Sequence, residues 1–211
     1  MLAQRNQFYS NSLTSVVPRV DLDLIEQWIQ PKARVLDLGC GDGSFLARLM
    51  KTKQVVGYGV DISDQNVQAS IRNGVSVIQQ DLEAGLAMFQ DQAFDVVILS
   101  QTLQAMINTE RILKEIARVG REGIVSFPNF GNWYHVWSIA RGRMPVSRQM
   151  PYQWYNTPNI HLCTIKDFER LIDEIGYQVL DQGFFNDGRT VQCLKNLRSN
   201  LAVYRFKPKL G

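Results

Sequence analysis

Apolar and polar positions along the chain follow two alternating periods, which predict strands and helices in turn. Short apolar runs rich in β-branched residues indicate strands at 35–38, 55–61, 75–81, 94–100, 123–128, 177–185 and 201–206. Apolar residues spaced by three or four indicate helices at 21–30, 45–50, 63–74, 108–120 and 164–175. Strands that alternate with helices predict an α/β protein with a doubly wound, mostly parallel sheet that ends in a hairpin-like pair of strands.

Polar residues at the predicted helix starts are expected to cap them. The expected caps each stand at the start of an apolar-periodic segment, and they are Asp21, Ser63, Asn108 or Thr109, and Thr164. The helix that follows Ser63 is expected to turn Val67 and Ile71 toward the sheet.

The first predicted strand runs directly into a loop with glycines at alternating positions, Gly39, Gly41 and Gly43. Glycine lacks a Cβ and tolerates positive φ, and free N–H groups at the following helix start favour an anionic group. The loop therefore predicts a nucleotide-type cofactor site. Its spacing is one residue shorter than the dinucleotide motif G-x-G-x-x-G. With Asp37 two residues ahead of it, the loop resembles motif I of class I S-adenosylmethionine-dependent methyltransferases, in which the acid faces the cofactor's amino group. Cys40 fits as a small residue within it.

Acidic residues also close the second and third predicted strands. Asp61 lies 22 residues after Gly39, where a carboxylate can accept hydrogen bonds from ribose hydroxyls and repel a 2′-phosphate. By the same resemblance, Ile62 borders the cofactor, and Asp81 with Leu82 stands where these methyltransferases contact adenine. Capping of a helix is the alternative interpretation of both acids.

The fourth predicted strand ends at Ser100 and Gln101, which complete the expected cofactor site. Amino-group methyltransferases often carry the motif Asp/Asn-Pro-Pro-Tyr/Phe at this place, and many small-molecule methyltransferases carry a histidine near position 104. This chain has neither, and Gln101 and Gln104 stand there instead. Glutamine cannot remove a proton at pH 7. His135 and His161 remain as candidate catalytic bases, although His161 can instead pin the loop before a helix.

Residues 129–163 interrupt the strand and helix rhythm with aromatic residues and prolines. Such an insertion after a strand is expected to cover a ligand or present a partner surface, and the alternative is a small satellite core that buries most of the aromatics. Arg141, Arg143 or Arg148 can clamp an anionic substrate. The expected substrate-facing or partner-facing residues are Gln104, Trp133, Arg141, Arg143, Tyr152, Trp154 and Tyr155.

Composition narrows these hypotheses. With 211 residues, 45% hydrophobic and 20% charged, and no linker or repeat, the chain is expected to form one domain, in which residues 1–19 are a polar lead-in.

No apolar run approaches the roughly 20 residues of a membrane span, and residues 1–15 lack a signal-peptide core, so a cytoplasmic location is expected. Three separated cysteines predict neither disulfides nor a zinc site. A net charge of +3 without a recognisable module does not favour nucleic-acid binding.

Longer runs in the insertion resemble the MetW family. They are SFPNFGNW at 126–133, GRMPV at 142–146 and PYQWYNTPNIHLCT at 151–164, joined by the glycine loop and SQTLQ at 100–104. The match covers most of residues 20–180. It implies a class I methyltransferase fold with a Rossmann-like seven-stranded sheet whose last strand is antiparallel. It also implies S-adenosylmethionine or S-adenosylhomocysteine as cofactor, and a role in bacterial methionine biosynthesis beside a MetX-type homoserine O-acyltransferase.

Three functions therefore remain open from the sequence. The first is a cofactor-binding partner or regulatory subunit of the acyltransferase, which the missing base favours. The second is an active methyltransferase on a small metabolite. The third is a nicotinamide oxidoreductase, against which the short glycine spacing and Asp37 argue.

Overall fold

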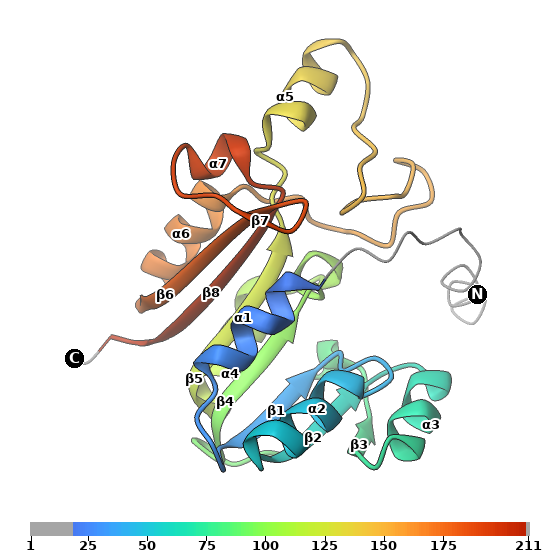
Figure 1. The fold of residues 1–211 in the computed structure, drawn as a ribbon, viewed down its shortest axis with the longest axis vertical. Coiled ribbons are helices and arrows are strands. Elements are labelled where there is room, and N and C mark those ends of the chain that lie inside the picture. Colours follow the sequence, from blue (N-terminus) through green and yellow to red (C-terminus); the bar gives the residue numbers. More distant parts are fainter. Residues whose placement is uncertain (1–18, 210–211) are drawn as a thin grey trace.

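Eight strands form a single sheet in the order β3-β2-β1-β4-β5-β8-β6-β7 (Figure 1). The computed structural model describes residues 19–209. The strands are β1 (Arg34–Leu38), β2 (Val56–Asp61), β3 (Ser76–Gln79), β4 (Phe94–Ser100), β5 (Gly120–Pro128), β6 (Tyr177–Asn186), β7 (Arg189–Thr190) and β8 (Leu201–Pro208). Strands β1 to β5 pair in parallel, and β8 runs antiparallel between β5 and β6. The predicted α/β sheet with an antiparallel last strand is confirmed. The hairpin partner β7 was not predicted, because two residues carry no periodicity.

Helices cover both faces of this sheet. They are α1 (Val20–Trp28), α2 (Ser44–Lys53), α3 (Asp64–Arg72), α4 (Thr109–Val119), α5 (Trp133–Ala140), α6 (Ile165–Glu174) and α7 (Lys195–Arg198), with short 3₁₀ turns η2 (Leu82–Ala84) and η3 (Leu103–Ala105). The helices α1 and α2 pack on one face, in front of the sheet in Figure 1, and α4 and α6 pack on the other. Consecutive strand residues contribute to opposite cores, as Val35 and Leu36 do in β1. This double coverage explains why the parallel strands are almost continuously apolar.

Two of the four expected helix caps are confirmed. Ser63 accepts a hydrogen bond from the N–H of Asn66, and Thr164 forms a capping box with Asp167. The prediction for Asp21 was wrong, because Arg19 precedes α1 and Asp21 lies within its first turn with the side chain buried. Asn108 occupies the N-cap position of α4, but its side chain accepts no capping hydrogen bond from the described residues.

The inward face of α3 also differs from the prediction. Ile71 is 62% exposed, and Ser70 is the residue of α3 that is buried. A methyl group built on Gly43 would lie 3.1 Å from the Cα of Ser70, so the glycine loop passes very close to this helix. Only a small side chain fits beneath the loop, and this requirement overrides the apolar spacing.

The aromatic insertion contains a helix that its pattern did not predict. Helix α5 follows the end of β5 and projects beyond the sheet at one end of the molecule (Figure 1). Trp133, Trp137, Trp154 and Tyr155 are all exposed, so the expected satellite core that buries most of the aromatics was wrong. Within residues 19–209, no helix is both long and apolar enough to cross a bilayer.

Candidate functional site

The candidate site lies at the carboxyl ends of β1, β2 and β4. Strand β1 is paired with β2 on one side and with β4 on the other, so the chain changes direction across the sheet at this point. Such a switch point leaves a crevice between the loops that follow the two strands. Asp37 stands near the end of β1, Asp61 ends β2 and Ser100 ends β4. The structure thus brings together Asp37 and Asp61, two of the three acids that the sequence analysis selected.

The glycine loop adopts a backbone that other residues rarely accept. Gly39, Gly41 and Gly43 have φ values of 69°, 59° and 72°. A methyl group on Gly39 would lie 2.7 Å from Thr102 Oγ1, and one on Gly43 would lie 2.7 Å from Ser70 Oγ. No atom lies within 4 Å of a methyl group built on Gly41. The loop is therefore packed on two sides and open at its middle glycine.

Asp61 fastens this loop to the second strand. Its Oδ2 accepts a 2.9 Å hydrogen bond from the N–H of Gly41, and its Oδ1 accepts bonds from Ser63 N at 2.9 Å and Asn66 Nδ2 at 3.1 Å. Each carboxylate oxygen has two acceptor positions, so Oδ1 is filled and Oδ2 retains one position for a ribose hydroxyl group. Ser70 supports the same loop by donating to the carbonyl of Gly41 at 3.1 Å.

Cys40 is a packing residue within the loop. A methyl group on Gly59 of β2 would lie 2.5 Å from its Sγ, so the thiol fills the space above that glycine. Burial and then the charge of Asp37 raise the pKa of Cys40 to about 12. The side chain stays a neutral thiol at physiological pH, in line with its expected role as a small residue.

Asp37 is a buried carboxylate that receives no side-chain hydrogen bond from the part of the chain that the structure describes. It is 4% exposed, and burial raises its pKa to about 7, with Arg19 acting to lower the pKa and Asp61 to raise it. No hydrogen bond from the described residues 19–209 counters this shift. A cation placed against the carboxylate would favour its charged form, so the position suits an ammonium group.

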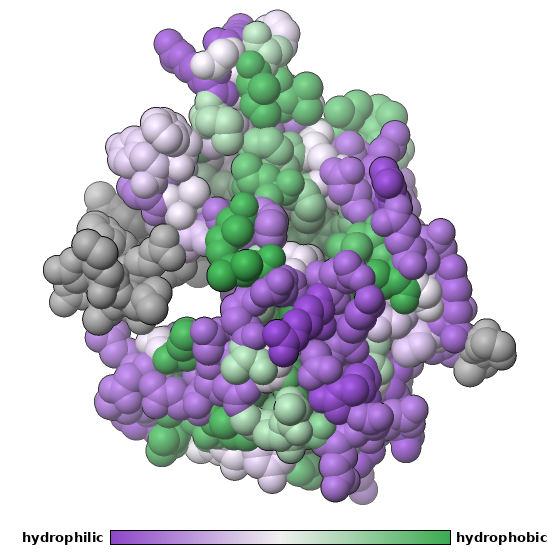
Figure 2. Space-filling view, turned by 180° about the vertical axis from the view of Figure 1, so that it is seen from behind, coloured by the Kyte–Doolittle hydropathy of each residue, from purple (hydrophilic) through white to green (hydrophobic). Residues whose placement is uncertain are grey.

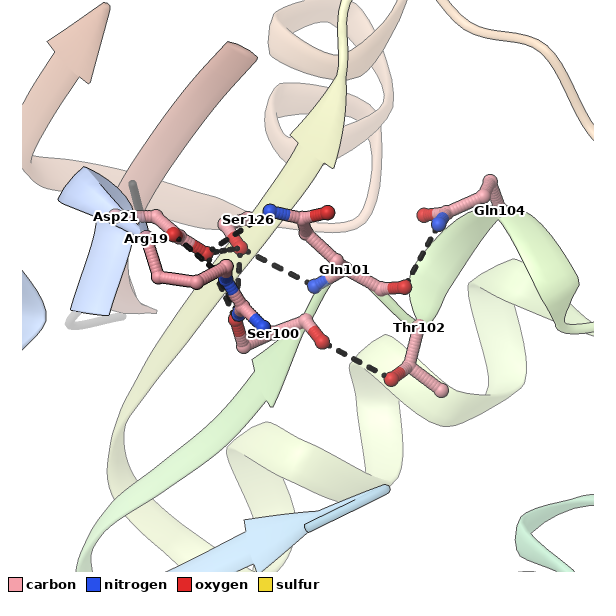
Figure 3. A network of polar contacts seen from close by, with 7 residues as sticks. All are labelled: Arg19, Asp21, Ser100, Gln101, Thr102, Gln104 and Ser126. Atoms are coloured by element: carbon pink, nitrogen blue, oxygen red, sulfur yellow. Dashed lines mark hydrogen bonds and ion pairs between the residues drawn. The ribbon is translucent and has the colours of Figure 1, made fainter. Parts of the chain in front are cut away.

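A polar network joins the start of α1 to the ends of β4 and β5 (Figure 3). Arg19 donates to Asp21 through Nε to Oδ1 at 3.0 Å and through Nη2 to Oδ2 at 2.9 Å. The same Nη2 also donates to Ser100 Oγ at 2.7 Å. The hydroxyl groups of Ser100 and Ser126 both donate to Asp21 Oδ2 at 3.0 Å. Asp21 thereby fixes the guanidinium of Arg19 at the edge of the switch point.

Arg19 and Asp21 were not among the site residues inferred from the sequence. Burial acts to raise the pKa of Asp21, but Arg19 and the two serine hydroxyls outweigh it and hold the pKa below its ordinary value. A signal was present, because Asp21 is in register with Ile25 and Ile29 on the inward stripe of the helix. A charged residue on an apolar stripe is buried only with partners. The remainder of the predicted lead-in, residues 1–18, lies outside the described residues.

Gln101 adopts a strained backbone directly after β4. Its φ is +50°, a value uncommon outside glycine and asparagine. Its N–H donates to the carbonyl of Ser126 at 2.8 Å and to Ser126 Oγ at 3.1 Å, while its Nε2 donates to Asp21 at 3.3 Å. Gln104 Nε2 donates to the carbonyl of Gln101 at 2.7 Å. Strain held by several bonds is a feature of functional sites.

The expected adenine-side residues follow β2 and β3. The N–H of Gln80 donates to the carbonyl of Asp61 at 3.1 Å, which sets the two strand ends side by side. Asp81 caps the η2 turn by accepting from the N–H of Glu83, so its side chain has the local role that was the alternative interpretation. Leu82 is buried beneath this turn, and Ile62 is exposed at the end of β2.

The two histidines occupy different places. The backbone N–H of His161 donates to the carbonyl of Gln104 at 3.0 Å, and the ring Nε2 of His161 lies 3.1 Å from the carbonyl oxygen of Ile107. Gln104 and His161 both line a groove of about 910 Å³ between α4 and α6. His135 is buried in the insertion with Nε2 3.1 Å from Ser147 Oγ, and burial lowers its pKa. His135 therefore remains neutral at pH 7 and holds the insertion together.

The remaining predicted residues lie in the insertion. Trp133 begins α5, and Arg141 follows its end with the guanidinium 4.5 Å from the Trp137 ring centroid. Arg141 and Arg143 line a second hollow of about 560 Å³ between α5 and residues 143–146. Trp154 and Tyr155 are exposed in the following coil and contact each other edge to face, and Tyr152 beside them is half-buried.

Comparisons with known proteins agree with this architecture. A family model described as "Methionine biosynthesis protein MetW" matches residues 19–206. The bifunctional methionine biosynthesis protein MetXA/MetW of Rhodopirellula baltica is 35% identical over 208 residues, which cover 92% of this chain and 33% of that protein. The chain spans about a third of the length of the curated relatives it matches.

Two solved structures share the fold. A S-adenosylmethionine-dependent methyltransferase from Thermotoga maritima, described as a possible histamine N-methyltransferase, superposes with a TM-score of 0.65 at 17% identity, covering 90% of this chain and 88% of that one. A methyltransferase from Archaeoglobus fulgidus gives a TM-score of 0.65 at 16% identity, with coverages of 88% and 94%. At this identity the similarity establishes the class I methyltransferase fold alone.

Proposed function

This chain belongs to the MetW family of methionine biosynthesis proteins, and from that premise we propose that it binds S-adenosylmethionine or S-adenosylhomocysteine and acts as the partner subunit of a homoserine O-acyltransferase. The cofactor site is the crevice at the β1–β4 switch point. The acyltransferase is the partner whose activity the bound cofactor influences.

The residues of the crevice fit the chemistry of this cofactor. Its amino-acid end carries an ammonium and a carboxylate, and the crevice offers the unsupported carboxylate of Asp37 beside the fixed guanidinium of Arg19. The open side of Gly41 allows close approach to the backbone. Asp61 would accept a ribose hydroxyl, and Asp81 with Leu82 would border adenine. S-adenosylmethionine supplies an electrophilic methyl group when it is bound.

The observation that carries the cofactor proposal is the burial of Asp37 without a hydrogen-bond donor among residues 19–209. We expect S-adenosylhomocysteine to bind the purified protein in a calorimetric titration, and Asp37→Ala to weaken binding by about 10-fold to 150-fold, because a charged hydrogen bond contributes roughly 1.5–3 kcal/mol. Asp42→Ala is the matched control, since Asp42 lies in the same loop and its carboxylate accepts only from its neighbour Ser44 among the described residues. No heat of binding with the native protein would overturn the proposal.

The acyltransferase proposal is supported by the fused relative, whose printed name joins MetXA to MetW. Two proteins that act together as separate chains in one organism are often fused into a single chain in another. We expect this protein to co-elute with a homoserine O-acyltransferase from the same genome and to raise its rate of homoserine acylation. Stable co-elution without any change of rate would contradict the proposed role.

Among the described residues, neither the glutamines after β4 nor the two histidines supply a base at the crevice, which favours the partner role over methyl transfer. Gln101 and Gln104 follow β4, and neither amide can accept a proton at pH 7. His135 is buried and bonded to Ser147. His161 is exposed on the groove between α4 and α6.

That groove keeps an active methyltransferase as the second candidate. Its volume of about 910 Å³ is large enough for a small metabolite, and Gln104 links it to the backbone of Gln101. In this case S-adenosylmethionine is converted to S-adenosylhomocysteine when a metabolite extract is added. His161→Ala abolishes the conversion if His161 is the base, while His161→Gln, which keeps a polar side chain, does not restore it.

A further inference from the structure

We propose that the exposed aromatic surface of the insertion is where the acyltransferase subunit docks, an inference that rests on the partner role proposed above. We call this surface the insertion face. Its members are exposed apolar and aromatic side chains of α5 and of the coil that follows it: Trp133, Tyr134, Val136, Trp137, Ile139, Trp154 and Tyr155.

The composition of α5 conflicts with its exposure in the isolated chain. The eight residues of α5 are six apolar or aromatic residues, one histidine and one serine. Of these eight, His135 alone is buried. Trp133 is 58% exposed and Trp137 is 52% exposed. A helix that is hydrophobic on every side is normally covered by protein. Seen from behind, hydrophobic residues extend from α5 down over the middle of the molecule (Figure 2). The helix therefore has the character of one half of an interface.

The insertion face is held in place before any partner arrives. Asn132 is buried and caps α5 by accepting from the N–H of Tyr134 at 3.0 Å. The ring of His135 packs 5.4 Å from that of Phe130 and bonds to Ser147, which closes the insertion on itself. A surface that is already ordered loses little conformational entropy on binding. The exposed tryptophans are thus presented as rigid anchors.

Charge indicates what kind of surface fits this face. Residues 129–163 contain the three arginines Arg141, Arg143 and Arg148 and no aspartate or glutamate. Two copies that met through this face would bring arginines of the same sign together, and like charges across an interface are unfavourable. A partner with an apolar centre and acidic residues around it is complementary.

The fused relative identifies this partner. In Rhodopirellula baltica the MetW-like part is 33% of a longer protein that also bears the name MetXA, so both parts stay together in one chain. Where the two parts are on different chains, the corresponding contact forms between subunits, and an exposed hydrophobic face suits such a contact. The occupant is therefore the acyltransferase subunit.

The test compares two double variants for binding to a purified homoserine O-acyltransferase from the same genome. Trp133→Ala with Trp137→Ala truncates the anchors, and Ile71→Ala with Met88→Ala is the control, since both control residues are similarly exposed but lie outside the insertion. We expect the tryptophan variant to bind about 30-fold more weakly or worse, and the control to stay within about twofold of the native protein. Thermal unfolding confirms that each variant is folded.

A second variant tests the charge argument at two residues that follow α5. Arg141→Glu with Arg143→Glu is expected to slow association with the acyltransferase, and the slowing should shrink as salt concentration rises. Equal binding by native protein and all variants would overturn the docking surface while leaving the partner role intact. No binding by the native protein would instead reject the partner role. Self-association that the tryptophan variant abolishes, in sedimentation of the protein alone, would assign the face to a second copy and overturn the inference.

Discussion

The hydroxyl of Ser126 donates a 3.0 Å hydrogen bond to Oδ2 of Asp21, which joins β5 to the first turn of α1 across 105 residues of sequence. Asp21 is fully buried and accepts from Arg19 and Ser100 as well. The contacts of Asp21 therefore fix the side of the crevice that carries Arg19.

Removing the charge of Asp21 is expected to destabilise the fold. Asp21→Asn leaves the guanidinium of Arg19 without its carboxylate and replaces one acceptor oxygen by a donor. We expect a loss of about 2–3 kcal/mol in the free energy of unfolding, measured by urea denaturation at pH 7. Asp23→Asn, on the exposed side of the same helix, should change it by less than about 0.5 kcal/mol. Equal effects of the two substitutions would contradict a structural role for the network.

The network also predicts a specific loss of stability in acid. The pKa of Asp21 is lowered in the folded protein, so its stabilising contribution is present above the unfolded-state pKa of about 4 and is lost as the pH falls through the lower folded value. The difference in unfolding free energy between native protein and Asp21→Asn should therefore shrink below pH 4. A constant difference from pH 7 to pH 3 would mean that the charge of Asp21 is not the cause.

Asp37 is expected to behave in the opposite way. Its folded-state pKa of about 7 lies above the ordinary aspartate value, so the folded protein binds more protons than the unfolded chain between about pH 4 and 7. This carboxylate makes the fold less stable as the pH rises through that interval. Asp37→Asn should raise the free energy of unfolding at pH 8 by about 1–3 kcal/mol while it weakens cofactor binding by about tenfold or more. A variant that is both less stable and still able to bind would refute this account.

The same pKa predicts how cofactor affinity depends on pH. An ammonium group binds the charged form of Asp37, so affinity for S-adenosylhomocysteine should be constant above pH 7.5 and fall toward tenfold per pH unit below pH 7. Calorimetric titration from pH 5.5 to 8.5 measures this. A profile that is flat across the range would indicate that Asp37 does not hold the ammonium.

The sequence predicted the parts of this protein in which a repeated pattern governs the structure. Strand β4 has the predicted limits, 94–100. A nearly continuous apolar run bounded by polar residues is typical of a strand that is covered on both faces, so the run itself marks where the strand begins and ends. The loop from Gly39 to Gly43 was identified because its positive φ values require glycine. Both features depend on neighbours in the sequence and not on distant contacts.

The features that were missed depend on tertiary contacts. Asp21 has the spacing of a helix cap, and only its approach to Ser100 and Ser126 shows why a charge occupies the inward stripe. Helix α5 is apolar on all sides, so it has no amphipathic period by which to recognise it. Ser70 faces inward because the backbone at Gly43 leaves no room for a larger residue.

Gly41 and Gly43 of the loop should differ in how far substitution by alanine destabilises the protein. Gly43→Ala meets both a positive φ and the backbone of Ser70, whereas Gly41→Ala meets the positive φ alone. We expect Gly41→Ala to cost about 1–2 kcal/mol and Gly43→Ala to cost at least about 1 kcal/mol more, in chemical denaturation. Because the methyl group of Gly41→Ala projects into the open side of the loop, it should also weaken cofactor binding although the fold persists. Unchanged affinity in this variant would place the cofactor elsewhere.

The strain at Gln101 allows a test that separates stability from binding. Gln101 and Gln54 share a left-handed backbone, with φ values of 50° and 56°, but Gln54 is exposed at the end of α2, away from the crevice. Glycine relieves the strain at both positions, so Gln54→Gly should raise the free energy of unfolding by up to about 1 kcal/mol. Gln101→Gly gains the same relief but loses the hydrogen bond from Nε2 to Asp21, so its stability should stay within about 1 kcal/mol of the native value. If Gln101 borders the cofactor, only Gln101→Gly should lower affinity for S-adenosylhomocysteine, measured by calorimetry beside the unfolding experiment. Equal affinities for both variants would mean that the strain serves the fold, through the bonds that Gln101 makes with Ser126, and not the ligand.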